Sequence, residues 1–306
     1  MKNKNLLGTA QLLLAAFIWG SAFVAQSAGM DFVGPFTFQS VRFTIGGLVL
    51  IPLIAVRGAI SRKKPDYTPP SKADNKQLLK AGIIAGIVLA TAAAFQQCGI
   101  VYTTVGKAGF ITTLYVIFVP LCGLFLKKLP AINLWIAVGL ATIGLYLLCM
   151  TESFSLSLGD TLVLLCAVCY TGHILVVGHY SEQLDPIKFS SIQFLTVGVV
   201  TAIPALIFET VTFSALIAAW LPILYTGLLS SGVAFTLQVV AQQYTEPTIA
   251  AITMSFESVF AVLSGMVVLS QIPTTREIWG CVIMFTAIIL AQLPTAWFRF
   301  KHKEMP

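Results

Sequence analysis

The chain has 306 residues, of which 57% are hydrophobic and only 10% are charged, whereas about 25% of residues are charged in a typical soluble protein. This small number of ionisable side chains cannot cover a water-soluble fold without leaving large apolar patches. The composition therefore excludes a soluble protein. The six cysteines are scattered through apolar segments, and we interpret them as small buried residues rather than disulfide partners. We therefore predict an all-α integral membrane protein.

Ten apolar segments are long enough to cross a hydrocarbon core of about 30 Å, which takes about 20 residues of helix. The first is too long for the apolar region of a cleaved signal peptide and shows no clean cleavage pattern. Turn residues separate the segments, as at Gly34-Pro35, Asp185-Pro186 and Glu246-Pro247, and the one long polar connection is residues 58–77. The predicted spans are residues 7–28, 36–57, 78–101, 107–126, 131–150, 158–178, 187–208, 216–240, 247–269 and 277–297.

The basic residues predict the orientation, because Lys and Arg accumulate on the cytoplasmic side of membrane proteins. With the N-terminus inside and ten spans, only two of the 18 Lys and Arg residues, Lys107 and Arg276, fall outside, and Arg42 lies within a span. One missed span would invert every later loop, so this bias supports both the count and cytoplasmic N- and C-termini. It also explains the net charge of +6 as a topology signal, without nucleic acid as a partner.

The chain contains an internal repeat. Residues 34–43 align with residues 185–194, and each segment opens the second helix of its half. Further along, Tyr102-Thr103 aligns with Tyr244-Thr245. Because each half has five helices, an odd number, the second copy enters the membrane from the opposite side, as in secondary transporters with inverted repeats. We expect a first half over residues 1–150, which includes the cytoplasmic loop 58–77, and a second half over residues 151–306.

Several motifs resemble those of a known family. The run from Tyr102 to Pro120 resembles the helix 3–4 signature of the EamA family, which belongs to the drug/metabolite transporter superfamily. Trp19-Gly20-Ser21, Arg42-Phe43 and the segment from Ala250 to Glu257 are similar to other parts of the same pattern. The resemblance implies a ten-helix fold of two EamA-like repeats around a central cavity, and transport of small metabolites, often the export of amino acids or drugs.

Two charged residues, Arg42 and Glu257, lie well inside predicted spans, and a charge at the centre of a span costs roughly 2.5–3.5 kcal/mol on insertion scales. Glu257 lies near the middle of its span, and removal from water favours the neutral form of a carboxyl, which suits a group that binds and releases a proton. It is the candidate for proton coupling, and the alternative is a structural hydrogen bond. Arg42 lies about 10 Å from the end of its helix. Snorkelling favours a structural anchor; otherwise its planar fork would hold a substrate carboxylate.

Polar and aromatic residues in the spans predict a cavity, because small-molecule sites are mostly apolar with a few placed polar groups. The glutamines serve either as donors and acceptors for a substrate or as hydrogen-bonded glue between helices. His173 is either a proton shuttle or a partner for a neighbouring helix. The aromatic residues either form cavity walls or pack. The cavity candidates are Trp19, Phe23, Gln26, Gln97, Tyr115, Tyr170, His173, Gln193, Gln238 and Glu257.

Together these features predict a secondary transporter of the inner membrane that exports a small amphipathic metabolite by alternating access. No phosphate-binding motif of the type G-x-x-x-x-G-K-[ST] is present in the sequence, so ATP is not expected to drive transport. No cofactor is implied, and no metal-ligand spacing occurs. An uncoupled facilitator or channel, and an importer or exchanger of the same fold, are the alternatives. An intramembrane enzyme would need a nucleophile–base or metal constellation that the spacing does not provide.

Overall fold

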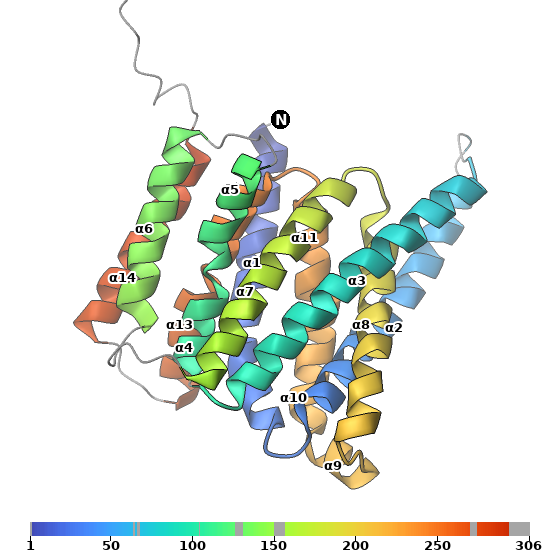
Figure 1. Cartoon of the computed structure of the whole chain (residues 1–306). Helices are drawn as coiled ribbons and strands as arrows, with labels where there is room; N and C mark the ends of the chain where they lie inside the picture. Colours follow the sequence, from blue (N-terminus) through green and yellow to red (C-terminus); the bar gives the residue numbers. More distant parts are fainter. Residues whose placement is uncertain are drawn as a thin grey trace, which may run out of the picture.

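The structure is a computed structural model that describes residues 2–63, 65, 68–103, 105–125, 131–149, 157–269 and 274–293. Its regular structure over these residues is entirely helical (Figure 1), which confirms the predicted all-α class. The turns expected at residues 127–130 and 271–273 and the C-terminal end lie outside the described residues. The helices are α1 (Lys2–Gly29), α2 (Pro35–Arg62), α3 (Lys72–Ile100), α4 (Val105–Thr112), α5 (Tyr115–Phe125), α6 (Ile132–Cys149), α7 (Leu158–Tyr180), α8 (Pro186–Phe208), α9 (Phe213–Ala218), α10 (Trp220–Leu224), a π-helix (Tyr225–Ala234), α11 (Phe235–Ala241), α12 (Pro247–Met254), α13 (Glu257–Leu269) and α14 (Thr275–Gln292).

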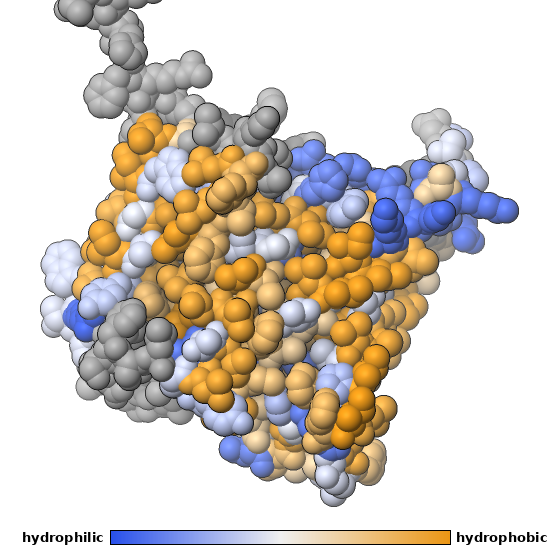
Figure 2. Space-filling model, viewed as in Figure 1, coloured by the Kyte–Doolittle hydropathy of each residue, from blue (hydrophilic) through white to orange (hydrophobic). Residues whose placement is uncertain are grey.

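Eight helical segments among the described residues are long and apolar enough to cross a membrane. The apolar part of α6, Ile132–Leu147, is shorter, and α14 packs along α6 at one edge of the bundle (Figure 1). A broad hydrophobic surface covers the middle of the molecule, and hydrophilic residues gather where α2 ends and α3 begins (Figure 2). This distribution matches a bundle whose sides face lipid and whose ends face water.

The helix starts follow the local sequence. Pro35, Pro186 and Pro247 each occupy the beginning of a helix, where the missing N–H of proline costs nothing. The polar connection is shorter than the predicted 58–77, because α2 continues to Arg62 and α3 already begins at Lys72. A capping box sets the start of α3: Ser71 and Asp74 accept each other's backbone N–H at 3.1 and 2.8 Å, which satisfies two donors of the first turn.

Two predicted spans are interrupted rather than continuous. The span 107–126 is divided into α4 and α5 at residues 113–114, and the span 247–269 into α12 and α13 at residues 255–256. A hydroxyl lies at each break: Thr113 donates to the carbonyl of Phe110 at 2.9 Å, and Ser255 donates to that of Ile252 at 2.8 Å. These side chains share carbonyls of the preceding turn with main-chain N–H groups, at the positions where the two helices break.

The predicted span 216–240 also differs from a regular helix. It begins at the end of α9 and continues through α10, the π-helix and α11 in succession. Wide turns of this kind occur often at functional sites. Here the π-helix brings the carbonyl of Ser230 to 3.3 Å from the indole nitrogen of Trp19, which donates to it.

The helices pack in a reciprocal pattern. The first-half helix α3 packs against α7 and α8, and the segment from α10 through α11 packs in the same way against α1 and α2. The most extensive contact between two helices joins α2 and α8, on the side of the bundle opposite α6 and α14 (Figure 1). The buried core therefore lies mainly between the two halves of the chain.

Hydrogen bonds at the α2–α8 crossing are reciprocal as well. Ser40 Oγ donates to the carbonyl of Gly198 at 2.8 Å, and Ser191 Oγ donates to the carbonyl of Gly47 at 3.0 Å. Ser40 and Ser191 are equivalent when Pro35 is aligned with Pro186, and so are Gly47 and Gly198. A methyl group at either glycine would overlap a side chain of the opposite helix, so both glycines permit the close approach.

Candidate functional site

A cavity lies inside the bundle, with walls from both halves of the chain. The centre of a water molecule can occupy about 40 Å³ of it, enough for about three waters. A ligand much larger than this requires the helices to move. The lining residues are Trp19, Phe23, Gln26, Arg42, Gln96, Thr112, Tyr115, Tyr170, Ile174, Ser230, Phe235, Gln238, Met254 and Glu257.

Most lining residues form pairs that occupy equivalent positions in the two halves. Two pairs follow the alignment of Pro35 with Pro186, and three, among them Tyr115 with Glu257, follow an offset of 142 residues. When two repeats supply the same positions to one cavity, that cavity lies where the repeats meet. The pairs are Trp19 with Tyr170, Phe23 with Ile174, Gln96 with Gln238, Thr112 with Met254, and Tyr115 with Glu257.

The pair Tyr115 and Glu257 lies directly after the two helix breaks. Tyr115 is the first residue of α5 and Glu257 the first of α13, and the Tyr115 hydroxyl donates to Glu257 Oε1 at 3.4 Å. The Glu257 side chain is only 5% exposed, and no basic side chain among the described residues forms an ion pair with it. Helix α1 passes close by, because Gly20 has no side chain to overlap the Glu257 carbonyl.

The other polar lining groups are held by hydrogen bonds. Gln96 Nε2 donates to Thr112 Oγ1 at 3.2 Å, and the Tyr170 hydroxyl donates to Gln96 Oε1 at 3.4 Å. Gln238 Nε2 donates to Gln242 Oε1 at 3.1 Å, while Gln238 Oε1 has no protein partner. The amide of Gln26 likewise has an unpartnered Oε1. The wall thus combines fixed groups with acceptors that are still free.

Arg42 also lines the cavity. Its side chain is 1% exposed, so its guanidinium is buried and does not extend to the surface of the bundle. Nε donates to Gln39 Oε1 at 2.6 Å, and the guanidinium carbon lies 4.6 Å from the centre of the Phe43 ring.

Three predicted cavity residues lie outside the lining, in buried contacts between helices. Gln97 Nε2 donates to the backbone carbonyl of Gln26 at 3.2 Å. His173 Nε2 lies 3.0 Å from Gln193 Oε1, and His173 Nδ1 and Gln193 Nε2 have no protein partner. These groups pack beside the cavity and connect helices.

The other seven predicted candidates and Arg42 do line the cavity. The sequence reasoning missed six lining residues: Gln96, Thr112, Ile174, Ser230, Phe235 and Met254. Two of these, Gln96 and Ile174, are the repeat equivalents of the predicted candidates Gln238 and Phe23, so the internal repeat carried a signal that could have found them. Among the described residues, no group of three or more His, Cys, Asp or Glu side chains could hold a metal ion.

The comparisons with known proteins agree with this architecture. The EamA-like transporter family model matches residues 6–150 and again residues 157–293. A protein from Archaeoglobus fulgidus described as an uncharacterized transporter is 31% identical over 291 residues, which cover 95% of this chain and 87% of the relative. A solved crystal structure of a protein, 17% identical, superposes with a TM-score of 0.77 over 96% of this chain and 99% of that chain, which shows a shared fold.

The fold and the cavity define a multi-pass membrane protein of two repeats with a shared internal site. The two family matches identify its class as membrane transporter. The chain belongs to the EamA-like transporter family, a family of the drug/metabolite transporter superfamily.

Proposed function

We propose that the protein is a secondary transporter that exports a small metabolite by alternating access through the central cavity. The observation that carries the proposal is that five pairs of repeat-equivalent residues line one cavity. Two repeats that can exchange conformations around a shared site open it alternately to the two sides of a membrane. No chemical conversion of the substrate is part of the proposal.

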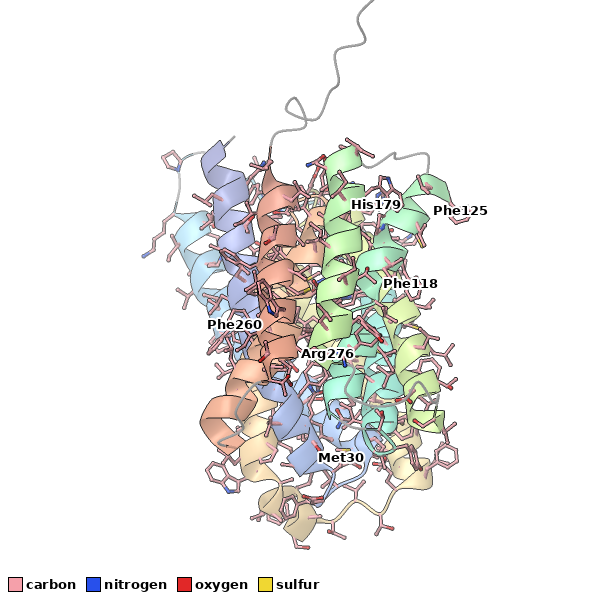
Figure 3. All side chains as sticks on the ribbon, turned by 90° about the vertical axis from the view of Figure 1, so that its left-hand side faces the viewer. Met30, Phe118, Phe125, His179, Phe260 and Arg276 are labelled. Carbon is pink, nitrogen blue, oxygen red and sulfur yellow. The ribbon has the colours of Figure 1, made fainter. Side chains whose placement is uncertain are left out.

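The proposed topology has ten spans in two inverted halves, residues 1–150 and 151–306, with both termini in the cytoplasm. The eight apolar segments account for eight spans, and the adjacent helices α6 and α14 supply the other two. Met30, just after α1, and His179, near the end of the equivalent helix α7, lie near opposite ends of the bundle (Figure 3). This placement supports inversion of the second half, and the distribution of Lys and Arg supports cytoplasmic termini.

The paired helix breaks supply a mechanism for the exchange of conformations. Residues 113–114 and 255–256 interrupt helices that contribute to the cavity from opposite halves. Rotation at either break moves one half-helix relative to the other and requires only the few backbone hydrogen bonds of the turn at that break to rearrange. The hydrogen bond between Tyr115 and Glu257 joins the two breaks. A change of conformation at one break therefore alters a contact of the other.

We propose Glu257 as the group that couples transport to protons. A carboxylate that is buried in a membrane protein and has no basic partner is costly in its charged form. Its protonation therefore depends on whether water reaches the cavity and from which side of the membrane. Protonation also changes the hydrogen bond that Glu257 can offer to Tyr115, because a neutral carboxyl donates as well as accepts.

The test begins with a metabolite screen on cells that overproduce the protein, in which internal and external pools are compared. The metabolite that is depleted inside and enriched outside is then used in proteoliposomes with an imposed proton gradient. Glu257→Gln is expected to abolish gradient-driven accumulation and to leave exchange down a substrate gradient. Glu246→Gln, at an exposed helix start, is the matched control. Unchanged gradient-driven flux in Glu257→Gln would refute the coupling role.

A further inference from the structure

The guanidinium of Arg42 is a buried cation without a protein counter-ion. It lines the central cavity, and it forms no ion pair with any carboxylate among the described residues. Of its donors, Nε is hydrogen-bonded to Gln39, whereas Nη1 is buried without a partner. An unpaired charge within a membrane span is among the most costly features that a helical bundle can contain.

The surrounding residues hold this guanidinium in a fixed orientation. Gln39 Nε2 donates to the carbonyl of Ala93 at 2.8 Å and to Gln97 Oε1 at 3.3 Å, so its Oε1 is directed at Arg42. The Phe43 ring lies 4.6 Å and the Phe38 ring 6.0 Å from the guanidinium carbon, within the range of cation–π attraction. The group is positioned on one side by these contacts while part of its donor fork is left unused.

The fold does not require a charge at this position. The repeat equivalent of Arg42 is Gln193, a neutral residue that is also fully buried and pairs with His173 at 3.0 Å. The same place in the same kind of helix is therefore filled without a cation. The positive charge of Arg42 is specific to the half in which the residue lines the cavity.

We propose that Arg42 binds an anionic group of the transported molecule, so that the substrate class is a small molecule that carries a carboxylate. The planar guanidinium matches a carboxylate in a two-point hydrogen-bonded pair, which would give Nη1 the partner that it lacks. The aromatic and aliphatic walls, including Phe23, Phe235 and Ile174, receive the rest of the molecule. This inference rests on the proposed transport function, because it assigns the substrate class of the same cavity.

The experiment measures binding rather than transport. Full-length protein is purified in detergent, and its thermal unfolding is followed with acetate, butyrate and benzoate, each compared with its neutral amide. The wild type is expected to bind at least one acid about tenfold or more tightly than the matching amide. Arg42→Gln installs the residue of the equivalent position and is expected to lose this preference, with amide binding unchanged.

Two further variants keep the test decisive. Arg42→Lys retains the charge without the fork, and is expected to keep a reduced preference for acids. Arg57→Gln removes an exposed arginine outside the cavity, and is expected to behave as the wild type. Equal binding of acids and amides, no response to any acid, or an acid preference that survives in Arg42→Gln would overturn the inference.

The inference and the proposed function can fail separately. Acid binding that depends on Arg42, without flux in proteoliposomes, would leave the binding site and remove the transport function. Flux of a substrate that carries no anionic group would leave the transport function and remove the role of Arg42.

Discussion

The N-terminus of α2 is capped by a residue from the other half of the chain. Glu209, just after α8, accepts hydrogen bonds from the backbone N–H groups of Phe36 and Thr37, both at 2.8 Å, and from the Thr37 hydroxyl at 2.6 Å. At the start of α8, the local residue Asp185 accepts from the two equivalent N–H groups, both at 3.0 Å. The first half has Gly34 at the position of Asp185, and a side chain there would overlap the Glu209 carboxyl.

This arrangement predicts a rescue between two destabilising substitutions. Glu209→Ala removes the acceptor of three hydrogen bonds and leaves two helix-end donors unpaired. With typical values for caps and charge-assisted bonds, reduced because Glu209 is half-exposed, we expect a loss of about 2–3 kcal/mol. Gly34→Asp forces a second carboxylate against Glu209 and should cost about 1–3 kcal/mol. In the double variant the carboxyl that the new aspartate would overlap is gone, and the aspartate can cap α2 as Asp185 caps α8. About 1 kcal/mol or more of the loss in Glu209→Ala should therefore be recovered.

The assay is reversible unfolding of the purified protein in detergent, followed by helix content as denaturing detergent is added. The double variant should be more stable than Glu209→Ala alone, whereas additive behaviour would make it less stable. Glu182→Ala, an exposed carboxylate at the end of α7, serves as the control and should leave stability nearly unchanged. A double variant as unstable as the sum of the single variants would show that Glu209 does not act as the cap of α2.

Two further predictions concern close packing. Ser40→Ala and Ser191→Ala should each cost about 1 kcal/mol and agree within about 0.5 kcal/mol, because the two hydroxyls make equivalent bonds across the α2–α8 crossing; clearly unequal losses in the same unfolding assay would contradict the reciprocal contact. Gly20→Ala should destabilise the protein by about 1–3 kcal/mol and reduce flux, because the added methyl overlaps the Glu257 carbonyl. Gly58→Ala, where a methyl meets open space within α2, should instead stabilise by about 0.5–1 kcal/mol, and the pair of measurements separates packing from helix propensity.

The sequence was informative about the fold where a local rule decides the structure. The helix starts at Pro35, Pro186 and Pro247 were readable because proline fits only the first turn. The breaks at residues 113–114 and 255–256 were not, because hydropathy runs on without interruption through both. A Thr or Ser within a helix usually donates to a carbonyl of the preceding turn without ending the helix, so their effect depends on tertiary packing that the sequence does not display.

The site was predictable in part for a similar reason. Glu257 and Trp19 stood out because buried charge and indole groups are unusual in an apolar span. The sequence analysis selected Gln97 as a cavity residue, whereas the adjacent Gln96 lines the cavity. Adjacent residues point about 100° apart around a helix, and composition does not tell which face meets the cavity. The offset that pairs Gln96 with Gln238 would have selected the lining residue.

The pairs in the cavity also indicate where the two halves stop being equivalent. If every pair were matched in chemistry, exchange of the two repeat conformations would give states of similar energy, and no ion could favour one of them. A ligand shifts such an equilibrium only by the difference in its affinity for the two states. For an ion, positions where the halves differ in charge contribute most to that difference, and these are Glu257, whose equivalent is Tyr115, and Arg42, whose equivalent Gln193 lies beside the cavity. Since one residue is acidic and the other basic, and they belong to different halves, a proton at Glu257 and an anion at Arg42 bias the exchange through opposite repeats. Under the proposed function, coupling between a proton and an anionic substrate would therefore act through these two pairs, which belong to different repeats.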